Sequence, residues 1–252
     1  MHVDICPNSG QYQITPKSEK ASCPYCRGDI PDMLGRASKR MKLYMDRAFV
    51  SLRRSEEQKK YAKLALADID SMLELEKDGG HTLLKGLYIK ARMMALAADM
   101  PEETIKVTGE VLSLHKRYPY ALDIDRVSTT NCWQAEAYSA TGKWDDAAKI
   151  YMSLHKDFLL YGNRQDPYTI IGMTRTMYEA GIYDEAIKIG SLAFQMNRSF
   201  PSVHKYVALS QKAQGDIEEA KKTISRAILY EEHWDKDNLQ KNKDILRELN
   251  NL

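Results

Sequence analysis

The chain has 252 residues, and its hydrophobic content of 43% is enough for a substantial buried core. Its 37 basic and 35 acidic residues leave a formal net charge of +2, which excludes a whole-molecule attraction to nucleic acid or anionic lipid. The opening MHVDICPNSG lacks the basic and apolar regions of a secretory signal, and no later segment approaches the roughly 18 uninterrupted apolar residues of a membrane span. We therefore expect a soluble, cytoplasmic protein that does not act at a membrane.

Three of the four cysteines fall in the first 26 residues, which favours a local site over a disulfide framework. The motif Cys23-Pro-Tyr-Cys26 resembles the active site of glutaredoxins. That chemistry needs a buried strand before the motif and a helix after it, whereas polar residues precede it and Gly28 and Pro31 follow closely. The stretch CPYCRG also resembles a zinc knuckle, in which two nearby thiolates bind one ion.

A full zinc ligand set can be assembled around this motif. Cys6 opens CPNSG, which reads like a second knuckle with Ser9 in place of a cysteine, and His2 lies four residues earlier. We therefore predict a structural Zn²⁺ held by His2, Cys6, Cys23 and Cys26, with free thiols or a decayed site as the alternative. Because protein ligands fill all four positions, no hydrolysis is expected. The segment QYQIT between the cysteines alternates as a short hairpin strand does.

Basic residues are concentrated just after this segment. Residues 36–63 hold ten basic and three acidic side chains, which is a candidate surface for nucleic acid or an acidic protein. A solvated helix face is the simpler interpretation, because the few aromatic residues, Tyr44, Phe49 and Tyr61, have spacings that suit core packing.

Self-similarity appears in the second half of the chain. AGIYDEAIKIGSLAF and QGDIEEAKKTISRAI share a glycine, an apolar residue two positions later, an acidic pair and two alanines, and Gly181 and Gly215 lie 34 residues apart. TGKWDDAAKIYMSLH repeats the opening of this pattern at Gly142. The pattern resembles the tetratricopeptide repeat, a helix-turn-helix unit with a period of about 34 residues. The resemblance implies an all-α fold, a right-handed α-solenoid of tetratricopeptide-like helix pairs with the small metal-bound cap at its N-terminus.

The resemblance also gives each shared residue a structural place. The three glycines lie at the turn between the two helices of a pair, where a positive φ costs glycine little. The acidic pairs lie in the first turn of each second helix and complement its dipole. The alanines that follow them, Ala147, Ala186 and Ala220, are small where the paired helices cross. Pro201 opens the last repeat.

We expect two parts, a zinc-knuckle-like segment at 1–31 and a repeat domain at 32–252 with about eleven helices and no strands. The repeat domain divides into degenerate pairs 32–77 and 81–117, clearer repeats at about 127–160, 167–199 and 201–230, and a capping helix at 233–252. The first pair breaks near Ser55, whose Ser-Glu-Glu sequence is typical of a helix cap. In the second pair Pro101 starts the second helix and Thr104 replaces the small alanine.

By register with the family, the first helix of each pair lines a concave groove that receives a peptide or a partner helix. The residues expected to face this groove are Ile89, Met93, Cys132, Glu136, Tyr168, Ile171, Arg175, Tyr178, Lys205 and Leu209. One branch of the family clamps the C-terminal carboxylate of chaperones with Lys, Asn and Arg, and residues such as Ile89 and Glu136 do not fit that role. The mixed character of the groove predicts an internal peptide or a helical protein as ligand.

The sequence therefore predicts a non-enzymatic scaffold or adaptor that binds a partner protein in this groove and carries a structural zinc site. The alternative is a nucleic-acid-binding or transcription-associated factor that uses the zinc knuckle and the basic helices 36–63. No paired carboxylates, nucleophile with a base, or phosphate-binding loop can be read from the sequence, which argues against an enzyme. Cys132 fits a small buried residue better than a nucleophile, because no base is linked to it.

Overall fold

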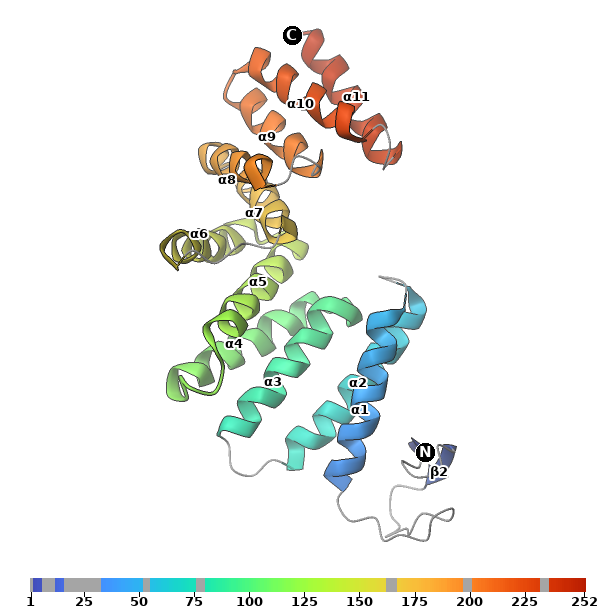
Figure 1. Cartoon of the computed structure of the whole chain (residues 1–252). Helices are drawn as coiled ribbons and strands as arrows, with labels where there is room; N and C mark the ends of the chain where they lie inside the picture. The colour runs from blue at the N-terminus through green and yellow to red at the C-terminus, as the bar shows by residue number, and fades with distance from the viewer. Residues whose placement is uncertain are drawn as a thin grey trace. The chain divides into compact units, whose positions relative to one another are not determined.

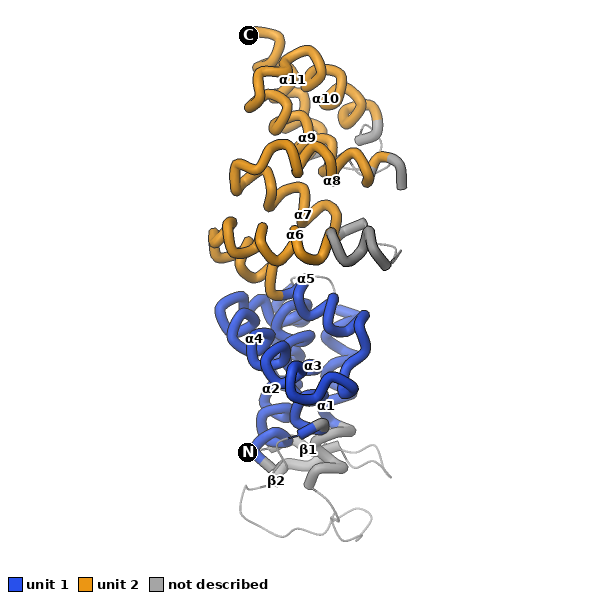
Figure 2. The backbone as a smooth tube through the Cα atoms, turned by 90° about the vertical axis from the view of Figure 1, so that its left-hand side faces the viewer, with its two compact units in different colours: residues 1–133 blue, residues 134–252 orange. Residues whose placement is uncertain are grey.

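The computed structural model describes residues 2–5, 12–15, 33–51, 55–75, 80–161, 167–196, 201–231 and 236–252. These residues form eleven α-helices, one π-helix and two short strands (Figure 1). No strand occurs in the described residues from 33 onward, so the prediction of an all-α repeat region with about eleven helices is confirmed. The chain divides into two units, Met1–Trp133 and Gln134–Leu252, which Figure 2 colours separately.

A two-stranded antiparallel sheet lies at the N-terminal end of unit 1. Strands β1 (His2–Ile5) and β2 (Tyr12–Thr15) pair so that His2 is opposite Thr15 and Ile5 is opposite Tyr12. The strand predicted from the alternation in QYQIT is therefore confirmed.

The remainder of unit 1 consists of antiparallel helices joined by short connections. They are α1 (Met33–Val50), α2 (Glu56–Leu75), α3 (His81–Met93), the π-helix η1 (Met94–Ala98), α4 (Pro101–Arg117) and α5 (Ile124–Ala140), which runs on into unit 2. The cap predicted at Ser55 is confirmed, because its Oγ accepts a hydrogen bond from the backbone N–H of Gln58 at 3.1 Å. Asp123 caps α5 in the same way through the N–H of Arg126 at 2.8 Å.

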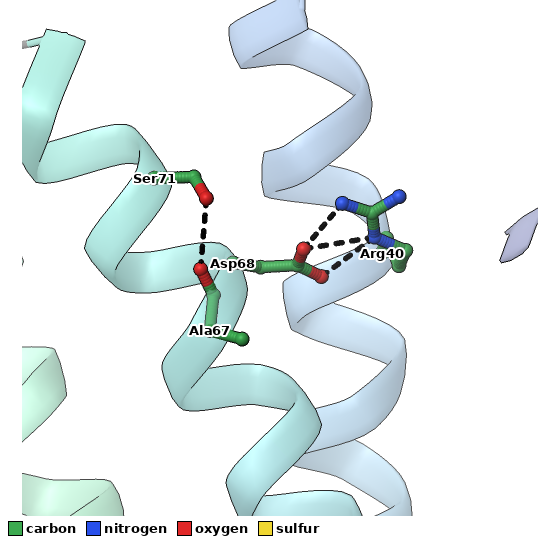
Figure 3. Close-up of polar contacts among 4 residues, drawn as sticks. All are labelled: Arg40, Ala67, Asp68 and Ser71. Carbon is green, nitrogen blue, oxygen red and sulfur yellow. Dashed lines mark hydrogen bonds and ion pairs between the residues drawn. The ribbon is translucent and has the colours of Figure 1, made fainter. Parts of the chain in front are cut away.

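Two ion pairs join α2 to the helices α1 and α3. The Arg40 guanidinium of α1 donates to both carboxylate oxygens of Asp68, with Nε 2.7 Å from Oδ2, and both side chains are largely buried (Figure 3). On the other side, Lys90 Nζ of α3 lies 2.7 Å from Asp70 Oδ1. These pairs fix α2 between α1 and α3 and add directional contacts to the apolar core.

The turn between α3 and α4 departs from the regular helix. The π-helical segment η1 buries Met94, Ala97 and Ala98, and the backbone then turns at Asp99 with φ of 56°. Asp99 takes the left-handed conformation that glycine adopts elsewhere in the chain, which aspartate tolerates better than most residues. Pro101 then opens α4, and Thr104, buried and bonded through Oγ1 to the carbonyl of Met100, occupies the place of the small alanine.

Unit 2 contains the regular repeats. Its helices are α6 (Trp144–Tyr161), α7 (Pro167–Glu179), α8 (Tyr183–Met196), α9 (Pro201–Ala213), α10 (Ile217–Glu231) and α11 (Lys236–Asn250). The helices α5, α7 and α9 are the first members of successive pairs, and α6, α8 and α10 are the second members. Figure 2 shows α7 to α10 layered in chain order within this unit.

The glycine turns of unit 2 have the predicted geometry. Gly142, Gly181 and Gly215 have φ of 75°, 74° and 90°. In each turn the residue after the glycine donates its N–H to the carbonyl five residues earlier, as from Ile182 to Met177 at 2.8 Å. This is the Schellman arrangement, which satisfies carbonyls at the helix end.

The other family positions are also confirmed. Ala147, Ala186 and Ala220 are fully buried, and an acidic pair lies in the first turn of α6, α8 and α10. Close packing extends to Gly190 of α8, where an added Cβ would lie 2.2 Å from Cγ2 of Val207 in α9. Small residues at these crossings let the helices approach closely, and this approach positions the side chains of α7 and α9.

Candidate functional site

Six side chains of α7 and α9 form the candidate site of unit 2. We define the α7–α9 face as Ile171, Arg175 and Tyr178 of α7 with Lys205, Tyr206 and Leu209 of α9. The two helices pack directly against each other. Arg175 is exposed and the other five residues are half-buried. The face therefore presents cationic, aromatic and aliphatic groups together on the first helices of two successive pairs.

Aromatic rings support both cations of this face. Arg175 Cζ lies 5.4 Å from the centroid of the Trp144 ring, and Lys205 Nζ lies 5.4 Å from the centroid of the Tyr206 ring. The ring of Tyr178 joins the two helices, with its centroid 5.9 Å from that of Tyr206. Cation–π contacts of this kind stabilise each cation and restrict its motion without neutralising its charge.

The electrostatics show that these groups influence one another. Burial raises the pKa of Tyr206 above its ordinary value, while nearby Arg175 lowers it and Glu179 raises it. Burial also raises the pKa of Tyr178, and Glu179 raises it further. Both phenols are therefore protonated at neutral pH, and each has a hydroxyl that is able to donate a hydrogen bond to a ligand.

The predicted groove residues of unit 2 divide between this face and its neighbours. Arg175, Tyr178 and Lys205 lie around the ring of Tyr206, while Ile171 lies one turn before Arg175 on α7 and Leu209 one turn after Lys205 on α9. Glu136 is exposed on α5, and Tyr168 lies in the first turn of α7, where its side chain falls outside the described residues.

The predicted groove residues of unit 1 are less accessible. Ile89 is half-buried and packs against the core of the unit. Met93 is fully buried in that core, and Cys132 is 9% exposed. Cys132 is thus the small buried residue that the sequence suggested.

The sequence did not single out the rings beneath the two cations. Trp144 and Tyr183 occupy the same repeat position, two residues after the turn glycine, and Tyr206 follows Lys205 directly. Tyr183 contacts Tyr178 with 6.0 Å between ring centroids. The recurrence of an aromatic residue at that repeat position could have been found in the sequence. The contact of Trp144 with Arg175 could not, because it depends on tertiary structure.

Most of the predicted metal ligands lie outside the described residues. This applies to Cys6, Cys23 and Cys26, while His2 is described only by its backbone pairing in β1. Within the described ranges, no group of three or more His, Cys, Asp or Glu side chains could hold a metal ion. The zinc site therefore stays a prediction.

Several side chains of the basic stretch 36–63 are engaged inside unit 1. Arg40 is paired with Asp68, and Lys59 Nζ lies 3.6 Å from a Glu56 oxygen and 3.7 Å from an Asp99 oxygen. Tyr44, Phe49 and Tyr61 pack against the core, as the simpler interpretation of this stretch predicts. The exposed basic side chains described in the stretch are Lys42, Arg47, Lys60 and Lys63. This division favours structural roles for part of the stretch over a continuous nucleic-acid surface.

Comparison with known proteins identifies the repeats. The family model of the tetratricopeptide repeat matches residues 133–158. The TPR repeat-containing protein YpiA of Bacillus subtilis (strain 168) is 33% identical over 99 residues, which is 39% of this chain. The match spans only 22% of that relative's own length.

Solved structures show the same arrangement of helices. A kinesin light chain-type protein from Podosopora anserina with nearly identical TPR-like repeats has a TM-score of 0.58 at 14% identity, covering 78% of this chain and 95% of that one. MamA from Desulfovibrio magneticus RS-1 has a TM-score of 0.57 at 11% identity, covering 78% of this chain and 98% of that one. These likenesses establish the fold class, an all-α stack of tetratricopeptide-like helix pairs. In the part of the chain that the structure describes, no helix combines the length and apolar character needed to cross a membrane.

Proposed function

We propose that this chain, which carries tetratricopeptide repeats, is a non-enzymatic scaffold or adaptor that binds a segment of a partner protein on the α7–α9 face. The observation that carries the proposal is the exposed, ring-supported Arg175 on the same side of α7 as the half-buried Ile171 and Tyr178, with Tyr178 in ring contact with Tyr206 of α9. Apolar surface with a few fixed polar groups is typical of peptide-binding surfaces on helical repeats.

The composition of the face fits a protein ligand better than a substrate to be transformed. Its aromatic and arginine side chains are the types that most often dominate binding energy at protein interfaces. Neither Tyr178 nor Tyr206 has a lowered pKa that would make it a nucleophile or a base near neutral pH. The face is suited to binding, and the proposed adaptor has no chemical step.

The test is affinity purification of the full chain from the cells that naturally express it. The variant Arg175→Glu with Tyr178→Ala changes the face, while Arg226→Glu with Leu229→Ala makes the same kind of change on the exposed side of α10. We expect the first double variant to lose a partner that the wild type and the α10 variant retain, as measured by quantitative mass spectrometry. Equal partner recovery from all three proteins would refute the proposed function.

We also propose that residues 1–31 form a structural zinc cap. Support comes from the Cys-x-x-Cys spacing and from the hairpin β1–β2, since Cys6 follows β1 directly. The expected ligands are those predicted above. Elemental analysis of the purified chain should give about one zinc per chain for the wild type and a lower content for Cys23→Ser. Equal zinc contents in the two proteins would contradict the site.

A further inference from the structure

The cations of unit 2 include several that nearby carboxylates neutralise and two, Arg175 and Lys205, that are held against aromatic rings instead. On the second helices, four lysines are each paired with the acidic residue three positions earlier. These pairs are Asp146 with Lys149, Glu185 with Lys188, Glu218 with Lys221 and Glu219 with Lys222. Arg175 and Lys205 on the first helices have no such carboxylate partner among the described residues. Two cations without a carboxylate partner among the described residues therefore lie on the α7–α9 face.

Lys212, about two turns after Lys205 on α9, illustrates the contrast. Its Nζ is paired with Oε1 of Glu248 from α11, so this cation is already neutralised within the unit. Arg175 and Lys205 are instead held against aromatic rings, which do not neutralise their charge. A cation that is held in place before binding loses less conformational freedom when a carboxylate arrives.

The neighbouring residues define the rest of the ligand. Ile171 and Leu209 are half-buried aliphatic side chains, so the ligand should bring an apolar side chain to the same face. Glu179, exposed next to Tyr178 on α7, raises the pKa of both Tyr178 and Tyr206, so a negative charge lies near these two rings. That charge disfavours a polyanion such as nucleic acid, which would bring one phosphate after another along the face.

We propose that the partner segment recognised by the α7–α9 face is an internal acidic peptide, with an Asp or Glu carboxylate bound by Arg175 and Lys205 and a neighbouring large apolar side chain against Ile171 and Leu209. This inference rests on the proposed function and specifies the chemistry of the ligand. A guanidinium binds a carboxylate through two parallel hydrogen bonds, and the Lys205 ammonium adds a second charge-assisted bond.

The experiment selects ligands from a phage-displayed library of short random peptides against the full chain. Peptides that bind the wild type should be enriched in Asp or Glu next to Leu, Ile or Phe, and the enrichment in acidic residues should disappear with Arg175→Gln plus Lys205→Gln. A selected acidic peptide, synthesised with an acetylated N-terminus and an amidated C-terminus, should bind about tenfold more weakly to each single Gln variant. Lys188→Gln, which removes a cation already paired with Glu185 on α8, should leave the affinity unchanged.

The outcomes separate this inference from the proposed function. Binders that lack acidic enrichment but depend on Tyr178 would overturn the acidic ligand and leave the adaptor function standing. Absence of any binder that depends on Tyr178 would count against both. If binding requires a free C-terminal carboxylate on the peptide, the proposal that the ligand is an internal segment is wrong.

Two other occupants are tested in parallel. A fluorescent single-stranded oligonucleotide that binds more tightly than the peptide, and is released by Arg175→Gln, would overturn the proposal in favour of nucleic acid. Self-association in sedimentation that Arg175→Gln abolishes would assign the face to a second copy of the chain. The proposal predicts neither result.

Discussion

The two units build the same helix pair with different residues. In unit 2 the turns are made by Gly142, Gly181 and Gly215, and buried alanines lie where the helices cross. In unit 1 the turn before α4 is made by Asp99 after a π-helical segment, and Thr104 stands at the crossing. Unit 1 therefore has the same helix-pair architecture as unit 2, although its sequence matches the repeat pattern only weakly.

The two units therefore share the geometry of the helix pair, while different interactions stabilise it in each unit. The helices of unit 2 approach closely because of small residues such as Gly190 and Ala186. The helices α1, α2 and α3 of unit 1 are joined by ion pairs at Asp68 and Asp70 in addition to their apolar core. We therefore expect unit 1 to be destabilised most by the loss of a charge pair between its helices. Unit 2 should be destabilised most by a larger side chain where its helices cross.

The largest effect is expected from Asp68→Ala in unit 1. Removal of this carboxylate takes from the largely buried Arg40 guanidinium the charge pair with Asp68, which should lower the free energy of unfolding by about 2–4 kcal/mol. Asp70→Ala is the control, because Asp70 is about half-exposed and its pair with Lys90 is worth about 0.5 kcal/mol. Urea denaturation measures both, and hydrogen exchange should place the loss in α1 and α2. Equal losses for the two variants would show that the buried pair has no special role.

In unit 2 the corresponding break is Gly190→Ala. The new methyl group would collide with Val207 and press on Val203, so the free energy of unfolding should fall by about 1–3 kcal/mol. The double variant Gly190→Ala with Val207→Ala should recover part of the loss, because it restores the space between α8 and α9. If the second substitution only adds to the first, the packing explanation is wrong.

A pH dependence is expected from His204 in unit 2. This side chain is buried and stacks on Phe194 with 3.8 Å between ring centroids, and burial followed by the charge of Arg226 lowers its pKa from 6.5 to about 4. The unfolded chain binds a proton between these two values and the folded chain does not, so the stabilisation is complete above pH 6.5 and is lost as the pH falls toward 4.

The expected loss is about 1–2 kcal/mol after allowance for residual solvent screening. It is measured as the difference in unfolding free energy between wild type and His204→Gln at pH 7 and at pH 4.5. The gap between the two proteins should shrink at the lower pH. If the difference in unfolding free energy is the same at both pH values, His204 is not the source of the pH dependence.

The smallest effect tests the turns themselves. Asp99→Gly gives unit 1 the turn residue of unit 2 and should stabilise it by about 0.5 kcal/mol, since glycine adopts a positive φ without strain and the ion pair that is lost, with Lys59 at 3.7 Å, is exposed and weak. Gly181→Ala should do the reverse and cost about 1 kcal/mol, although open space surrounds its Cβ position. Thermal unfolding of both variants measures these shifts, and a loss of stability in Asp99→Gly would contradict the equivalence of the two turns.

Much of the fold could be predicted from the sequence because local rules and family pattern agree in unit 2. Gly181 and Gly215 each predict a turn. The acidic pair after each glycine predicts a helix start, and the alanine after that pair predicts a close helix crossing. The π-helix before Asp99 could not be predicted, since it adds a residue to a helix turn without changing the apolar pattern of Met94 to Ala98.

The candidate site was predicted in part for the same reason. The resemblance to the tetratricopeptide family supplied Arg175, Tyr178, Lys205 and Leu209, because the family register assigns positions of the first helix in each pair to the groove. The contact of Arg175 with Trp144 joins two different pairs of helices, and only tertiary packing shows it. The burial of Met93 in the core of unit 1 likewise depends on neighbours distant in sequence.

Site-specific photo-cross-linking tests the central claim, that the α7–α9 face holds a partner segment, most directly. A benzophenone amino acid placed at Leu209 on this face is compared with the same group at Leu229, which is 65% exposed on α10. The account predicts a covalent partner adduct at position 209 in living cells, its loss with Arg175→Gln, and no such adduct at 229. Adducts of equal yield at both positions would contradict this claim. An adduct at position 209 whose yield is unchanged by Arg175→Gln would also contradict it.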